Sequence, residues 1–156
     1  MYIYKDNIKM NKYEEFTKCL KIGQIFEKKA QAKLIEYHKN KYKLLHENDT
    51  FEYDFLLSNG KYYEVKYCSM INCNNTIFLE TISNNKPSGI NTTKANYYIF
   101  VIKQKSKNIF INNVSLLFIK IKVKHLIKII EKNLFCNYYK DDLKQSFLIE
   151  IDTLKQ

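Results

Sequence analysis

The clearest alternation of apolar and polar residues falls over residues 51–68, FEYDFLLSNGKYYEVKYC. Aromatic and aliphatic residues recur at every second position on both sides of Asn59-Gly60, a dipeptide typical of tight turns between antiparallel strands. The pattern predicts a β-hairpin with one core-facing side and one charged side. The expected core-facing residues are Tyr53, Phe55, Leu57, Tyr63, Val65 and Tyr67.

The register of this hairpin depends on the length of its turn. If a three-residue turn ends with Gly60 in a left-handed conformation, Asp54 faces Glu64. Lys66 then shares that face, because residues two apart on a strand point the same way. A two-residue turn would pair Asp54 with Val65 and separate the carboxylates. Asn-Gly permits both turns, and we expect the longer one because it gathers the charged groups.

A helical pattern precedes the hairpin over residues 12–39, where apolar residues recur at intervals of three and four. The stripe comprises Phe16, Leu20, Gly23, Ala30 and Leu34. Glu27 interrupts it. A buried carboxylate is costly unless it is paired or metal-bound, so Glu27 either reaches the edge of the stripe or belongs to a site shared with Asp54.

Further elements are expected downstream. They are strands over 76–82, 95–103, 114–121 and 146–151 and a helix over 121–132. The strongly apolar strand 95–103 is expected to be central, and 146–151 is expected at an edge. Residues 40–50 read as a charged connection, and 133–145 as irregular or a short helix. The strand 76–82 is expected beside the hairpin. There its one charged residue, Glu80, would act as a further ligand or hold Lys66; on an exposed face it would do neither.

Composition narrows the class of partner. The chain has 156 residues, 46% of them hydrophobic, which suits one domain with a sizeable core. Its net charge of +10 indicates a polyanion such as nucleic acid. An anionic membrane surface is the competitor, but no apolar run is long enough to span a bilayer and no basic amphipathic helix is free to lie on one. The polar start and four cysteines without a CxxC pair favour an intracellular protein with reduced thiols.

The hairpin carries the candidate chemistry. Mg²⁺ prefers oxygen ligands and usually takes one or two carboxylates together with substrate phosphate, which Asp54 and Glu64 would supply. Lys66 would orient or help to deprotonate a water, or offset negative charge on the phosphate. These residue types suit metal-assisted phosphodiester cleavage. The alternative is an ordinary hairpin with a solvated charged face.

The loop over residues 84–94, NNKPSGINTTK, holds the only proline and one of three glycines. Its hydroxyl groups, backbone amides and lysines are suited to holding a DNA phosphate. The candidate DNA-binding residues are Lys86, Ser88, Gly89, Thr93 and Lys94. The simpler alternative is a tight turn between strands.

The order of these features resembles the PD-(D/E)XK nuclease superfamily: a helical glutamate, then an aspartate, then the motif EVK over residues 64–66. A longer stretch, FLE followed by KPSGINTTKANYYI, is similar to small phage and large-DNA-virus nucleases of that superfamily. The resemblance covers residues 22–101. Tyr53 stands where the family often has proline.

The resemblance implies a fold and a set of roles. The fold would be α/β, a restriction-endonuclease-like αβββαβ core whose mixed central sheet is flanked by helices, in a single domain over residues 1–156. Asp54, Glu64 and the Val65 carbonyl would bind Mg²⁺ or Mn²⁺. Glu27 would bind a second metal or its water shell, and Lys66 would orient the attacking water. Glu80 and the Ser88-Gly89 loop would support the site and contact substrate.

The resulting hypothesis is a metal-dependent DNA endonuclease of replication, recombination or repair, acting on branched or flapped DNA. Alternatives are a sequence-specific homing or restriction-type endonuclease, a catalytically silent nucleic-acid-binding module on the same fold, and an interaction protein that uses only its basic surface. Cutting symmetric strands would imply a homodimer. The expected location is cytoplasm or nucleus, in a host cell if the protein is viral.

Overall fold

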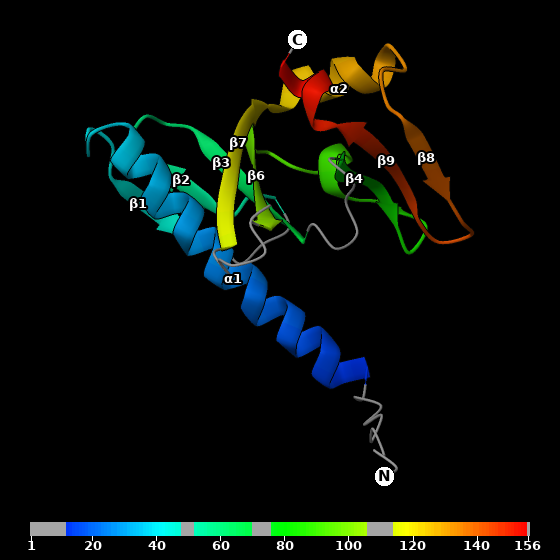
Figure 1. Cartoon of the computed structure of the whole chain (residues 1–156), viewed down its shortest axis with the longest axis horizontal. Helices are drawn as coiled ribbons and strands as arrows, with labels where there is room; N and C mark the ends of the chain where they lie inside the picture. The colour runs from blue at the N-terminus through cyan, green and yellow to red at the C-terminus, as the bar shows by residue number, and fades with distance from the viewer. Residues whose placement is uncertain (1–11, 48–51, 70–75, 106–113, 156) are drawn as a thin grey trace.

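The computed structural model describes residues 12–47, 52–69, 76–105 and 114–155, which form a mixed α/β fold (Figure 1). The elements in chain order are α1 (Lys12–Tyr37), β1 (Leu44–Glu47), β2 (Phe55–Leu57), β3 (Tyr62–Ser69), β4 (Thr76–Ser83), β5 (Lys86–Pro87), the 3-10 helix η1 (Gly89–Asn91), β6 (Tyr97–Lys105), β7 (Val114–Lys122), α2 (Val123–Glu131), β8 (Asn137–Lys140), β9 (Gln145–Glu150) and the 3-10 helix η2 (Ile151–Lys155). The predicted α/β class is therefore confirmed. None of the helices in the described ranges is long and apolar enough to cross a membrane.

The larger sheet has five strands in the order β1-β2-β3-β6-β7. Its neighbouring strands are antiparallel, except that β3 runs parallel to β6. A strand covered on both faces reads as a continuous apolar run, and β6 does so: its residues 98–102, YIFVI, are all buried. This strand is the central one that the sequence predicts.

Two cores pack against the two faces of this sheet. One contains Ala30 and Leu34 of α1 together with Phe55, Leu57, Tyr63, Val65, Ile99 and Val101. The other fills the space between the opposite face, the second sheet and α2, with Cys68, Tyr98, Phe100, Ile77, Ile149 and Leu126 among its members. Successive residues on a strand point to opposite faces, so β3 directs Tyr63 and Val65 toward α1. Glu64 and Lys66 point to the other side.

The turn between β2 and β3 is the three-residue type. Gly60 has φ +70° and its N–H donates to the Leu57 carbonyl (2.9 Å). Phe55 pairs with Tyr63, the register expected for this turn. The structure thus confirms the register on which the predicted approach of Asp54 to Glu64 depends.

Two strands fall in segments that were expected to be irregular. β1 lies within residues 40–50 and pairs with β2, and β8 lies within 133–145 and pairs with β9. All the residues of both strands are exposed. Because a strand with no buried face needs no apolar alternation, the sequence carries no periodic signal for either one.

The position of β4 corrects a second expectation. It does not lie beside the β2–β3 hairpin but belongs to the other sheet, whose order is β5-β4-β9-β8. The described part of the connection from β3 to β6 contains β4, β5 and η1, where the family core would have an α-helix. Consequently β9 is an inner strand rather than the expected edge strand.

Helix α1 confirms the predicted helix, but its apolar stripe is only partly buried. Figure 1 shows the N-terminal half of α1 extending beyond both sheets, and Leu20 there is 52% exposed. Ala30 and Leu34, further along, are buried. Glu27 thus lies close to where α1 leaves the sheet, at the border between its covered and its exposed part.

Candidate active site

Asp54 stands where the β2–β3 ladder ends. Its backbone N–H still donates to the Tyr63 carbonyl (2.9 Å), but two residues earlier the Glu52 carbonyl accepts from Lys94 N–H (2.8 Å). The chain has therefore turned away from β3 at that point. The Asp54 carboxylate takes the place of the next backbone acceptor, because its Oδ2 receives the Val65 N–H (2.5 Å). This bond fixes the carboxylate against β3.

Glu64 and Lys66 form an ion pair on the same side of β3. Lys66 Nζ lies 2.6 Å from Glu64 Oε1. Glu64 is buried, whereas the Lys66 side chain keeps 45% of its surface exposed. The two partners therefore differ in exposure: the carboxylate is buried, whereas Lys66 can still contact a molecule that arrives from solvent.

The charges around Asp54 alter its protonation. Burial, then the carboxylates of Glu64 and Glu27, raise the pKa of Asp54 to about 7, against the opposing effects of the Val65 N–H and Lys66. A cation placed here would relieve this crowding of negative charge.

Lys66 responds in the opposite sense. Burial by itself would lower the pKa of Lys66, but the Glu64 ion pair, followed by Asp54 and Glu80, outweighs burial and raises it. The side chain is accordingly an ammonium ion at neutral pH. In this state it can orient a water or neutralise phosphate charge, but it cannot accept a proton.

A pocket of about 280 Å³ adjoins Asp54, between α1 and the start of β2. Gln24, Glu27, Lys28 and Gln31 line its helical wall, and Glu47, Asp54 and Phe55 line the other. The structure thus brings Glu27 to the same pocket as Asp54.

Glu80 and the loop after β5 form one supporting unit. Ser88 Oγ donates to Glu80 Oε1 (2.6 Å). Gly89 has φ +54°, and a Cβ there would lie only 2.3 Å from the Glu80 carbonyl oxygen, so the close approach requires glycine. Although β4 lies in the second sheet, Glu80 remains near enough to Lys66 to help raise its pKa.

The other predicted DNA-binding residues have mixed surroundings. Lys94 Nζ is paired with Glu52 Oε1 (2.7 Å), and Thr93 Oγ1 donates to the Glu52 carbonyl (2.9 Å). Lys86 is exposed on β5. Four of the five candidates therefore contact the protein's own chain, as expected for a tight turn: Ser88, Gly89, Thr93 and Lys94.

Tyr98 is a site residue that sequence reasoning missed. It pairs with Glu64 across β3 and β6 and is fully buried, yet its hydroxyl has no hydrogen-bond partner among the described residues. The hydroxyl of Thr93 lies nearby, but it donates its hydrogen to the Glu52 carbonyl. Burial, then Glu64, Asp54 and Glu80, raise the pKa of Tyr98. A tyrosine within an apolar strand is predicted to belong to the core, and only its hydroxyl group could have indicated a role in the site.

The donor set fits a hard divalent cation in kind. In the described ranges no three carboxylate, imidazole or thiol side chains converge as a metal site. Mg²⁺, however, commonly takes only one or two carboxylates and fills its shell with water and phosphate oxygens. The N–H and C=O of a strand residue point to the same side, so the Val65 carbonyl points toward Asp54, as its N–H does. Asp54, Glu64 and this carbonyl would hold the ion.

Known proteins give no independent assignment. Comparisons of the chain with protein-family models, with curated proteins and with solved structures find no significant match. A function must therefore be argued from the geometry of the site and from the sequence resemblance.

Proposed function

We propose that this protein is a metal-dependent DNA endonuclease that hydrolyses phosphodiester bonds. The observation that carries the proposal is the meeting of Asp54, Glu64 and Lys66 at the end of the β2–β3 ladder, where burial and the neighbouring carboxylates raise the Asp54 pKa. Such crowding is typical of functional sites. It occurs in a chain of net charge +10, which suits a polyanionic substrate.

Each side chain has a distinct task in this mechanism. Asp54, Glu64 and the Val65 carbonyl would hold Mg²⁺ or Mn²⁺, which would supply Lewis-acid activation of the phosphate and of its attacking water. Lys66, cationic and partly exposed, orients that water and offsets negative charge developing on the phosphate. Glu27 extends the acidic wall of the pocket next to Asp54. Glu80, held by its hydrogen bond from Ser88, stabilises the positive charge of Lys66.

The cellular task proposed for this activity is replication, recombination or repair, with branched or flapped DNA as substrate. A homing or restriction-type enzyme needs additional elements that read base edges in the DNA grooves, and a chain of 156 residues has little room for them without dimerisation. A monomer suits the cutting of one strand, and a homodimer suits symmetric cutting.

The test is cleavage of labelled linear, flapped, single-stranded and four-way-junction DNA with Mg²⁺, Mn²⁺ or EDTA. Asp54→Asn keeps an acceptor for the Val65 N–H while removing charge, so it should fold and lose cleavage by about 10²-fold or more. Lys66→Ala should lose a similar amount. Lys61→Ala, an exposed lysine at the turn of the same hairpin, is the matched control and should cut normally.

Metal-dependent cutting that disappears in both site variants and persists in the control would support the proposal. Wild-type protein that binds DNA but cuts none of these substrates with any metal would contradict it. The favoured function would then be the catalytically silent binding module, with the carboxylates serving the structure of the hairpin.

A further inference from the structure

Aromatic rings and lysines gather at the C-terminal end of α1. We call this the Tyr37 patch: Tyr37, His38, Lys39, Lys41, Tyr42 and Lys120. Tyr37 is 74% exposed, the highest value among the large exposed hydrophobic residues described. Lys120, on the α1 side of β7, places its Nζ 5.8 Å from the Tyr37 ring centroid and 5.4 Å from that of Tyr97. A ring with a flanking ammonium group is therefore presented to solvent.

Contacts between rings hold the patch together. His38 packs edge-on against Tyr37 and against Tyr42, with centroids 5.2 Å and 4.9 Å apart. Lys41 Nζ lies 5.7 Å from the Tyr42 centroid. Burial, then Lys120 and Lys41, lower the pKa of His38, so this ring is neutral at pH 7. The positive charge of the patch comes from its lysines alone.

The backbone at this helix end is strained. Lys39 and Asn40 have φ of +51° and +57°, the left-handed region in which helices usually end on glycine. Their N–H groups donate to the carbonyls of Glu36 and Ile35, which closes the helix. A lysine thus occupies a position that favours glycine, and its exposed charge adds to the patch. The nearest carboxylate on the helix, Glu36, is already paired with Lys33 (3.0 Å).

We propose that the Tyr37 patch binds a single-stranded segment of DNA, with Tyr37 stacking on an unpaired base and Lys39, Lys41 and Lys120 contacting phosphates. Aromatic faces interspersed with positive charge are the usual means of holding single strands, because every unpaired base offers a face for stacking. Base pairs within a duplex offer none. The lysines select an anionic partner, and the exposed ring selects one with free bases.

This inference rests on the proposed function and specifies its substrate as DNA with an unpaired segment. Residues ten apart along a helix are separated by about 15 Å along its axis. Tyr37 stands at that separation from Glu27, which lines the pocket beside Asp54. A short single strand held on the patch could thus reach the candidate site along α1.

Binding is measured by fluorescence anisotropy with Asp54→Asn protein in EDTA, so that no cleavage occurs. The probes are a labelled oligothymidylate, an abasic strand of equal length and a duplex. Tyr37→Ala should weaken binding of oligothymidylate about tenfold, and Tyr37→Phe should restore it. On the abasic strand and the duplex, Tyr37→Ala should change little.

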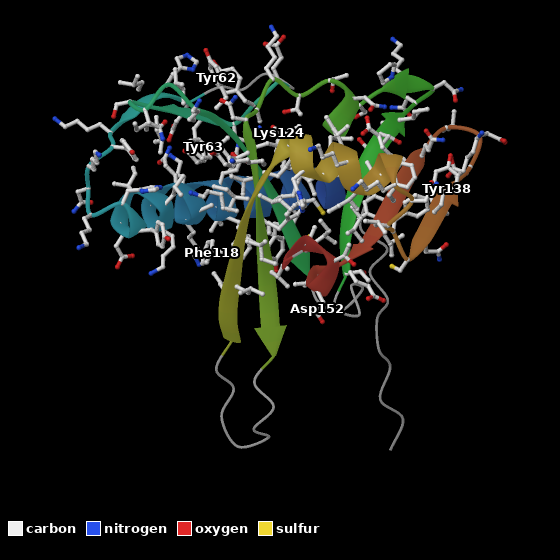
Figure 2. All side chains as sticks on the ribbon, turned by 90° about the horizontal axis from the view of Figure 1, so that it is seen from above. Tyr62, Tyr63, Phe118, Lys124, Tyr138 and Asp152 are labelled. Atoms are coloured by element: carbon white, nitrogen blue, oxygen red, sulfur yellow. The ribbon has the colours of Figure 1, made fainter. Side chains whose placement is uncertain are left out.

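The matched control is Tyr139→Ala, an exposed tyrosine on β8. In Figure 2, Tyr138 marks the β8–β9 hairpin, which lies apart from the part of the five-stranded sheet that Tyr62 and Tyr63 mark. This control should bind all three probes like the parent. Lys39→Gly should raise Tm, because it relieves the left-handed lysine, and should weaken binding of both single strands. A purely structural role for Lys39 would produce the first change without the second.

Equal weakening on duplex and oligothymidylate, or no weakening by Tyr37→Ala, would overturn the inference. So would loss of binding in Tyr139→Ala equal to that in Tyr37→Ala. Because the assay uses neither metal nor cleavage, absence of nuclease activity in the wild type leaves this result standing. If cleavage occurs but is unchanged by Tyr37→Ala, the proposed function stands and the inference of a single-strand patch is refuted.

Discussion

The two faces of the five-stranded sheet differ in kind although they share the same strands. On the α1 side, Phe55, Leu57, Tyr63 and Val65 pack with two helix residues into an apolar core. The other side also carries an apolar core, which includes Cys68 and Tyr98, but the neighbouring positions hold Glu64 and Lys66. The Tyr98 hydroxyl there has no hydrogen-bond partner among the described residues. Both faces therefore have an apolar core, and the second face also holds groups whose burial costs free energy. The contrast lies in these added polar and charged groups, which are the part of the sheet available for chemistry.

Truncating the apolar face should give the largest loss of stability. Leu57 is fully buried, so Leu57→Ala leaves a cavity and should lower the free energy of unfolding by about 2–5 kcal/mol. Urea unfolding measures the loss. Substrate binding by the surviving folded protein should be unchanged, and a selective loss of binding would contradict the division between the two faces.

The charged face should make stability depend on pH. Asp54 has a pKa of about 7 in the folded protein, against an ordinary value of 3.8 for an exposed aspartate. Between these values the folded state holds the proton more tightly than the unfolded state. The stability that this proton provides is complete below about pH 4 and lost as pH rises through about 7.

A difference of about 2 kcal/mol between pH 5 and pH 8 is expected from this group. Thermal melts across that range measure it, and Asp54→Asn should flatten the dependence. At pH 8, Mg²⁺ should raise the Tm of the wild type but not that of Asp54→Asn. A wild-type profile matching that of Asp54→Asn at every pH would refute the crowded-carboxylate account.

Two buried tyrosines allow a finer comparison of the faces. The Tyr63 hydroxyl accepts a hydrogen bond from Asn59 Nδ2 (3.0 Å), whereas that of Tyr98 has no partner among the described residues. Tyr63→Phe should cost about 1 kcal/mol, and Tyr98→Phe should be neutral or slightly stabilising. If Tyr98→Phe nevertheless slows cleavage, its hydroxyl serves the substrate or its water. Equal destabilisation by the two changes would remove the contrast.

Local patterns predicted much of this structure. Asn59-Gly60 predicted a tight turn and left two registers open, and the charged residues favoured the one that brings Asp54 near Glu64. The apolar run around residues 98–102 indicated the central strand. Both signals lie within a few residues of their effect, so they can be read from the chain without knowledge of tertiary contacts.

The remaining features depend on distant parts of the chain. The exposed strands β1 and β8 carry no alternation, and nothing near Glu80 indicates that β4 joins a second sheet with β9. The exposure of Leu20 arises because α1 runs past the sheet that would have covered it. Tyr98 escaped notice because its significance comes from its neighbour Glu64 on another strand.

The bond from Val65 N–H to Asp54 implies a hierarchy of tolerated residues at position 54. The side chain substitutes for a backbone carbonyl in the ladder, so its acceptor must be short and correctly placed. Asparagine meets that need, while glutamate is one methylene too long and alanine provides no acceptor. A selection for folding would therefore accept aspartate and asparagine alike, and a selection for catalysis would accept aspartate alone. Folding thus restricts position 54 to two residue types, and catalysis restricts it further to one of them.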